Sequence, residues 1–321
     1  MLGRLALILA LLWSGAGCAA TVVDATGRTV AVPDRIAHML PAGPPAAVLL
    51  EAVAPDLMLG WPSRVRPEAH ALLAPSAAGL PQIARLTGRE DVTDGIAALH
   101  PDLIIDYGTV SPRYADLVRT TQQRTGIPTV LLDGTLGKTP EVIRTVGVLL
   151  HREVRAEVVA RFLAGLLVVP PAAGHKRVLA ARGGDGLTPA GPGSDLGTLL
   201  TRLGWQVVVP AGPTPTSIDA IARLDPDIVV FSDPAMRTVL AGTPAWRNVR
   251  AVRDGHAYAA PGLPFGWLEE PPSINRLLGL AWLGGRDPVS LAVSFNDIVY
   301  GRVLTSSEAA GLLAGVPCVQ P

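Results

Sequence analysis

Cysteine is almost absent from this chain of 321 residues, which contains only Cys18 and Cys318. Cys18 lies in an N-terminal segment that resembles an export signal, so removal of that segment would leave a single thiol. A single thiol excludes an internal disulfide and a cysteine-based metal site in the remaining chain. We therefore expect the fold to depend on its hydrophobic core.

Charged and aromatic residues are also scarce. Charged side chains make up 17% of the sequence, and the 27 basic and 27 acidic residues give a formal net charge of zero. This balance offers no broad basic surface, so we expect no nucleic acid partner. Hydrophobic residues reach 49%, however. A chain of this length exceeds the usual limit of one hydrophobic core, which predicts two domains.

Residues 1–20 have the pattern of an export signal. Arg4 supplies a positive charge, residues 5–13 form an unbroken apolar run, and small residues follow to the end of the segment. The apolar run is too short for a membrane span, which needs about 20 residues. We predict a signal peptide that is cleaved near the end of this segment. The alternative is a lipid anchor at Cys18, although Gly15 stands where a lipobox normally has leucine.

Two stretches of the chain, residues 94–105 and 219–230, are nearly the same. Both have the form D-x-I-A-x-L-x-P-D-[LI]-[IV]-[IV], and they begin 125 residues apart, at Asp94 and Asp219. Solenoid repeats recur about every 20–50 residues, so this spacing suits two similar domains in tandem. A cleft between two domains is a common place for a small ligand. The alternative is that helix-Pro-Asp-strand is simply a frequent connector in α/β proteins.

Strand and helix patterns alternate through both halves of the chain. The strands are predicted at residues 35–40, 102–106 and 128–132 in the first half, and at residues 177–181 and 206–209 in the second. Helical patterns lie between them. This alternation predicts parallel sheets with helices on both faces. We therefore expect an α/β fold of two Rossmann-like lobes.

A helical pattern at residues 152–168 stands between the two halves. At 1.5 Å per residue it would be about 25 Å long, and no flexible Gly/Ser linker adjoins it. We expect a single long α-helix that joins the lobes, with a ligand cleft between them; the alternative is an ordinary helix that covers a sheet. The predicted domains are a signal peptide at 1–20, an N-terminal lobe at 21–151, a linking helix at 152–170 and a C-terminal lobe at 171–321.

Motifs that would carry catalysis or hold a metal are missing. The sequence contains no G-x-S-x-G, H-E-x-x-H or P-loop pattern. Residues 191–197 loosely resemble a dinucleotide-binding loop, but the glycine spacing is wrong; such a loop can still present backbone N–H groups to an anion. The six histidines are dispersed, so a zinc site is not expected. We expect no catalytic residues, no metal-ligating residues and no resident cofactor.

Aromatic and charged residues follow several of the predicted strands. In open α/β sheets, ligands bind beyond the carboxyl ends of the strands. Arginine offers fixed donors to anionic groups, and tryptophan or tyrosine offers flat apolar contact, so such ends suit a bulky, partly anionic ligand. The alternative is that each aromatic ring packs under its own loop. The candidate ligand-binding residues are Trp61, Arg64, Tyr107, Arg182, Trp267 and Glu269.

The order of signal, first motif, linking helix and second motif resembles the periplasmic binding proteins of ABC importers. The resemblance is to the subclass with a helical backbone, which serves iron–siderophore, haem, cobalamin and some oxyanion uptake. It covers essentially the whole chain after the signal. Residues 182–187 and 271–279 also resemble segments of the iron-complex and molybdate-type branches of that family.

This resemblance implies a monomeric periplasmic protein that is not an enzyme and whose partners are ABC permease transmembrane subunits and a small-molecule metal chelate. The family docks through one surface acid on each lobe, and these acids correspond to Asp94 and Asp219. The family often has glutamate there, whereas this chain has the shorter aspartate at both positions. Both residues open a predicted helix, where the helix dipole favours an acid; the alternative is that they are simple N-caps.

The function implied is capture of a metal chelate, a ferric siderophore above all, in the cleft between the lobes. Haem or cobalamin is the same kind of cargo. One alternative is a molybdate or tungstate oxyanion, which would need a tight site rich in backbone N–H donors. A different alternative is an exported enzyme on a two-lobed scaffold, which would need a nucleophile and a base within hydrogen-bond reach.

Overall fold

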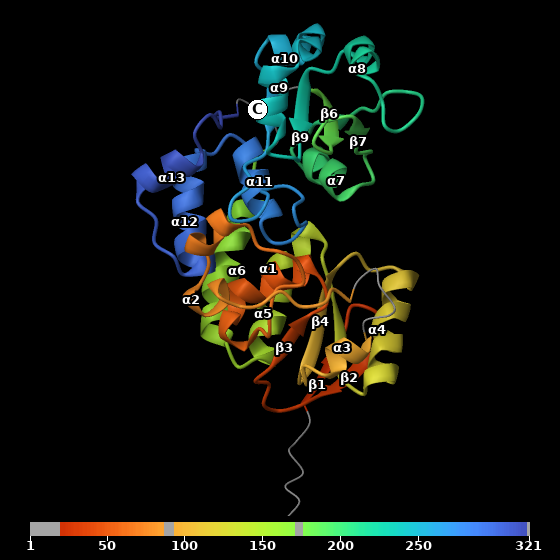
Figure 1. Cartoon of the computed structure of the whole chain (residues 1–321), viewed down its shortest axis with the longest axis vertical. Helices are drawn as coiled ribbons and strands as arrows, with labels where there is room; N and C mark the ends of the chain where they lie inside the picture. Colours follow the sequence, from red (N-terminus) through yellow and green to blue (C-terminus); the bar gives the residue numbers. More distant parts are fainter. Residues whose placement is uncertain (1–19, 87–92, 171–175, 320–321) are drawn as a thin grey trace, which may run out of the picture.

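The computed structural model describes residues 20–86, 93–170 and 176–319. Within them the chain forms two α/β lobes, which lie at opposite ends of the longest axis of the molecule (Figure 1). Each lobe has its own sheet. The predicted fold class is therefore confirmed. The predicted signal peptide, apart from Ala20, and the predicted lipid site at Cys18 lie outside the described residues.

The N-terminal lobe contains a parallel sheet in the order β3–β4–β5. Its strands are Met39–Pro41, Leu103–Gly108 and Thr129–Asp133. The first five residues of β4 are all buried, as expected for a parallel strand that is covered on both faces. Helices α1 (Pro44–Val53) and α5 (Thr139–Leu149) share the core of one face, while α3 (Thr93–Ala97) packs on the other with α4 (Pro112–Thr125).

An antiparallel hairpin and several short turns complete this lobe. Strands β1 and β2 are Ala20–Val23 and Thr29–Val32, and the turn between them is attached to β5 because the Ala25 N–H donates to the Leu131 carbonyl at 2.8 Å. The remaining short elements are α2 (Pro75–Ala78) and the 3-10 turns Pro55–Leu57, Pro67–Leu72 and Leu136–Lys138.

The C-terminal lobe contains the second sheet, in which β10, β9 and β6 are parallel neighbours. On its other side β6 pairs with β8 at its start and with β7 at its end. The strands are β6 (Arg177–Arg182), β7 (Thr188–Pro189), β8 (Gln206–Val207), β9 (Ile228–Phe231) and β10 (Ala257–Ala259). The helices are α7 (Asp195–Arg202), α8 (Ile218–Leu224), α9 (Met236–Gly242) and α10 (Arg250–Arg253), with a 3-10 turn at Pro244–Asn248.

The ends of α4 illustrate how local sequence sets the helices. Ser111 precedes the helix and its Oγ accepts a hydrogen bond from the Tyr114 N–H at 3.5 Å, which satisfies a donor at the helix start. Pro112 occupies the first helical position, where no N–H is needed. Gly126 ends the helix with φ of +72°, a left-handed conformation that glycine adopts without strain.

Helix α6 (Glu153–Leu167) leads from the first lobe to the second. It packs against α5, α1, α11 and α12, so it lies within the shared core of the molecule. The last three helices are α11 (Arg276–Leu283), α12 (Pro288–Tyr300) and α13 (Ser306–Leu312). Leu291, Phe295 and Val299 of α12 belong to the same buried cluster as Leu50 of α1 and Ile105 of β4. Helix α12 also contacts α1 directly, so it covers part of the N-terminal lobe. Within the described ranges, no helix combines the length and apolar character needed to cross a membrane.

The repeated motif forms the same structure in both lobes. In each lobe a helix, α3 or α8, leads through the Pro-Asp pair into a central strand, β4 or β9. His100 and Asp225 occupy the same position in the two copies, and their φ angles are 47° and 48°. Left-handed residues other than glycine are uncommon, so this agreement shows that both copies turn in the same way after the helix.

Candidate ligand-binding site

The two lobes meet at the carboxyl ends of β4 and β5, where a cavity of about 460 Å³ opens between them. We call this cavity the polar compartment, because tyrosine, carboxylate and guanidinium side chains supply much of its wall. Its position matches the rule that ligands of α/β sheets bind beyond the carboxyl ends of the strands. It is lined by Pro44, Pro45, Arg85, residues 106–110, Tyr114, Leu131 and residues 133–135 from the N-terminal lobe, and by Asp195, Pro271, Pro272 and Arg276 from the C-terminal lobe.

A close contact between two glycines shapes the floor of this compartment. The Gly134 N–H donates to the Gly108 carbonyl at 2.7 Å, where β4 and β5 end. A Cβ atom on Gly134 would lie 2.6 Å from the Gly108 Cα, which is too close for any side chain. The two strand ends therefore stay together beneath the cavity.

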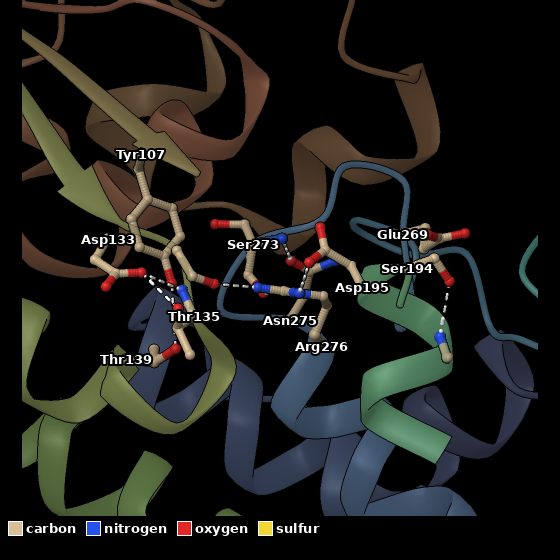
Figure 2. A network of polar contacts seen from close by, with 12 residues as sticks. Tyr107, Asp133, Thr135, Thr139, Ser194, Asp195, Glu269, Ser273, Asn275 and Arg276 are labelled. Atoms are coloured by element: carbon tan, nitrogen blue, oxygen red, sulfur yellow. Dashed lines mark hydrogen bonds and ion pairs between the residues drawn. The ribbon is translucent and has the colours of Figure 1, made fainter. Parts of the chain in front are cut away.

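Tyr107 lies at the end of β4 and lines the polar compartment, but only 1% of its surface is exposed. Its phenol lies 3.2 Å from the Thr139 Oγ1 atom (Figure 2). Burial raises the pKa of Tyr107, although the hydrogen bond to Thr139 and the Arg276 charge act in the opposite direction. The phenol is therefore neutral at physiological pH.

Asp106, next to Tyr107, is a buried carboxyl group in the wall of the polar compartment. Its Oδ1 accepts a hydrogen bond from the Tyr107 N–H at 2.9 Å, and its Oδ2 has no hydrogen-bond partner. Burial raises the pKa of Asp106 to about 6, and the Tyr107 N–H and the Arg85 charge partly oppose this shift. An acid in this environment titrates close to physiological pH.

Arg276 connects the two lobes at the polar compartment, and only 3% of its surface is exposed. From the start of α11 its Nη2 donates to the Gly134 carbonyl of the N-terminal lobe, and its Nη1 lies 3.4 Å from Asp195 Oδ1. Figure 2 shows its guanidinium between the Tyr107 cluster and Asp195. Nearby, Ser273 Oγ donates to the Pro45 carbonyl at 2.7 Å. The lobes are therefore joined by polar contacts beside the cavity.

A second cavity of about 340 Å³ adjoins the first, and the two share Pro44 and Pro271. We call it the aromatic compartment, because Trp61 and Phe265 form part of its wall with ring centroids 5.6 Å apart. Trp61 is buried, and its Nε1 donates to the Ala77 carbonyl at 2.9 Å. The other residues that line it are Val48, residues 63–66, Pro264 and Glu270.

The other candidate residues are distributed as follows. Arg64 is exposed and lines the aromatic compartment. Arg182 and Glu269 lie outside the lining of both compartments and pair with each other, with Nε to Oε2 at 2.6 Å. Trp267 is 1% exposed and packs edge-on against Trp282 at 6.2 Å. It lines a separate cavity of about 170 Å³ beside α12 and α13.

The two candidate docking acids lie near the starts of equivalent helices. Asp219 is exposed in the first turn of α8, and the N-cap of that helix is Ser217, whose Oγ accepts from the Ala220 N–H at 3.2 Å. Asp219 is therefore not needed as the cap. Asp94 is the second residue of α3, and its side chain lies outside the described part of the structure.

Sequence reasoning missed Asp106 and Arg276, although both leave a signal in the sequence. Asp106 interrupts the apolar run Leu-Ile-Ile at the end of β4, and Arg276 stands in an otherwise apolar helix. A charged residue in a buried element usually has a partner or a function. Among the described residues, no group of three or more histidine, cysteine, aspartate or glutamate side chains is arranged to hold a metal ion.

Comparisons with a protein-family profile and with solved structures point to the same class of protein. A family profile described as periplasmic binding protein matches residues 68–262. No curated protein sequence matches the chain. Among solved structures, the chain is similar to an ABC transporter solute binding protein from Sulfurospirillum deleyianum, with 20% identity, a TM-score of 0.80 and coverage of 91% of this chain and 98% of that one.

Two further solved structures share the fold. One is the molybdate periplasmic binding protein MolA of Haemophilus influenzae, bound to molybdate, at 16% identity and a TM-score of 0.66, covering 89% of this chain and 99% of that one. The other belongs to an ABC-type Fe³⁺-hydroxamate transport system of Saccharomonospora viridis, at 17% identity and a TM-score of 0.56, covering 82% of this chain and 97% of that one.

Proposed function

The chain belongs to the periplasmic binding protein family, and on that basis we propose that it captures a metal chelate, a ferric siderophore in particular, and delivers it to an ABC permease. The family implies a periplasmic location and a role in binding rather than in catalysis. For the N-terminus we propose cleavage near Ala20 rather than lipid at Cys18, which the mass of the mature protein would test.

The observation that carries the proposal is the pair of adjoining compartments between the lobes. Their volumes of about 460 and 340 Å³ fall in the range of small-molecule pockets, which is roughly 300–1,000 Å³. They share Pro44 and Pro271 in their walls, so they lie side by side, and we propose that one bulky ligand spans both. A small oxyanion would need far less space and a closed shell of donors.

The chemistry of the walls also suits a chelate. Phe265 is partly exposed and packs against the buried Trp61, so it can offer apolar contact to an organic ligand. Arg64 makes no hydrogen bond or ion pair among the described residues, so its guanidinium can meet a ligand oxygen. Tyr114, which is partly exposed, supplies aromatic surface in the polar compartment.

Delivery requires contact with a permease, and we propose that Asp94 and Asp219 make it. Asp219 supports this role because it is exposed and because Ser217 caps its helix in its place. The equivalent position of Asp94 in α3 would present one acid on each lobe. Arginines of a permease would pair with these acids.

Calorimetric titration of the purified protein would test the cargo. We expect a ferric tris-hydroxamate or tris-catecholate to bind with a Kd below about 1 μM, which corresponds to about 8 kcal/mol, and sodium molybdate not to bind. Arg64→Gln should weaken binding of the chelate, whereas Arg119→Gln, a change on the exposed face of α4, should not. Binding of molybdate without any chelate, haem or cobalamin would overturn the proposal.

A further inference from the structure

Asp106 differs from the other charged groups of the polar compartment because one of its oxygens is unsatisfied. Among the described residues, three buried side-chain atoms have no hydrogen-bond partner, and they belong to Glu51, Asp106 and Trp205. Of these three residues, Asp106 alone lines the cleft between the lobes. A buried acceptor without a donor is unfavourable, so a donor supplied from the cavity would have a large effect.

The neighbouring charges of the polar compartment already have partners. Asp133 accepts from the Thr135 N–H and Oγ1 at 2.9 and 2.6 Å and from Lys138 Nζ at 2.8 Å. Arg276 is held by the Gly134 carbonyl and by Asp195. Arg85, whose charge acts on Asp106, also has interactions of its own. The buried guanidinium is thus occupied by its own partners, whereas the buried Oδ2 atom of Asp106 lacks a donor.

We propose that Asp106 determines specificity by accepting a hydrogen bond from an ammonium group of the cargo, so that the protein selects chelates that carry a protonated amine over fully anionic ones. The inference rests on the proposed function, since it concerns the same cleft and the same class of cargo. A hydrogen bond between an ammonium and a carboxylate is charge-assisted, which makes it stronger than one between neutral groups.

A matched pair of ligands tests the inference without any variant. One is a linear ferric tris-hydroxamate that ends in a primary amine, and the other is the same chelate with that amine acetylated. At pH 7.5 the carboxyl of Asp106, with its pKa of about 6, is mostly ionised, and the amine is protonated. We expect the amine form to bind about tenfold more tightly, which is roughly 1.4 kcal/mol. Equal affinity for the two forms would overturn the inference.

Variants then assign the preference to one residue. Asp106→Asn should weaken binding of the amine form about tenfold and leave the acetylated form unchanged. Glu51→Gln is the matched control, because Glu51 is also a buried acid with an unpartnered oxygen but lies outside both compartments; it should keep the preference. Thermal unfolding would show that both variants fold. Equal loss with both ligands in Asp106→Asn would contradict the inference, whereas failure of both ligands to bind the unaltered protein would instead refute the ferric hydroxamate as cargo.

Discussion

Asp102 and Asp227 hold equivalent strands of the two lobes with the same pair of hydrogen bonds. The Asp102 N–H donates to the His38 carbonyl at 2.8 Å, and its Oδ2 accepts from the His38 N–H at 2.8 Å. The Asp227 N–H donates to the Arg177 carbonyl at 2.8 Å, and its Oδ2 accepts from the Arg177 N–H at 2.9 Å. The aspartate of each repeated Pro-Asp pair therefore fixes the start of the neighbouring strand.

Removal of either carboxylate should destabilise the protein by a similar amount. Asp102→Ala leaves the Ala37 and His38 N–H groups without their acceptor, and Asp227→Ala leaves the Arg177 N–H without its acceptor. An unsatisfied backbone donor costs roughly 1–3 kcal/mol. Both groups are partly exposed, so we expect a loss near the lower end of that range. Urea unfolding would measure it. Asp116→Ala on the surface of α4 should change stability by less than about 0.5 kcal/mol, and an equally large loss there would refute the strand-anchoring role.

Replacement of two glycines in consecutive helices by alanine should change the stability of the protein in opposite directions. A Cβ on Gly147 of α5 would lie 2.2 Å from the Ala156 Cβ of α6, so Gly147→Ala should cost about 1–3 kcal/mol by overpacking. A Cβ on Gly165 of α6 would have no heavy atom within 4 Å, so Gly165→Ala should stabilise the helix by about 0.5–1 kcal/mol. Thermal denaturation would measure the stability of both variants relative to the unaltered protein. A stabilised Gly147→Ala would mean that α5 and α6 are not packed this closely.

Glu51 should make folding stability decrease as the pH rises. Burial raises the pKa of Glu51 to about 8, against a value of 4.5 for the free side chain, although the Ala74 N–H and the Arg155 charge oppose the shift. Between these two values the unfolded chain has released the proton and the folded chain has kept it, so stability is full below about pH 4.5 and is lost towards pH 8.

Glu51→Gln has no proton to lose, so its stability relative to the unaltered protein should increase over this range of pH. The gain should level off above pH 8, at a size on the order of a few kcal/mol. Urea unfolding at pH 5, 7 and 9 would measure the difference. Parallel pH profiles for the two proteins would contradict the assignment to Glu51.

Asp219→Ala should impair transport without affecting capture of the ligand. The residue is exposed in the first turn of α8 and lies outside the lining of both compartments. Loss of an interfacial charge pair should reduce affinity for the permease by roughly fivefold or more. Uptake by reconstituted transporter, measured beside calorimetric titration of the chelate, would separate the two effects. Asp254→Ala, an exposed acid elsewhere on the same lobe, is the control, and equal loss of uptake there would argue against a specific contact.

Much of the fold is local in origin and was therefore predictable from sequence. The apolar run of β4, the stop at Gly126 and the repeated Pro-Asp pair depend on neighbours in the chain, and the structure contains all three features. The lobes and the helix α6 between them follow from the order of such elements.

The site was harder to predict because it depends on pairs that are far apart in the sequence. Arg182 and Glu269 each resembled a ligand contact, yet they are 87 residues apart and bind each other. Trp267 follows a loop at a strand end, but its ring packs on Trp282 in the core. Whether a polar or aromatic side chain faces a cavity or a partner is decided by tertiary packing, which periodicity does not encode.

The packing of α12 on α1 and α6 has a consequence for biogenesis. A ribosome delivers a chain from its N-terminus, so the first sheet emerges long before the helix that must cover α1. The N-terminal half would therefore keep apolar surface uncovered until Leu291, Phe295 and Val299 are synthesised. The N-terminal half should then mature only once α12 is in place, and it should not survive as a separately expressed fragment.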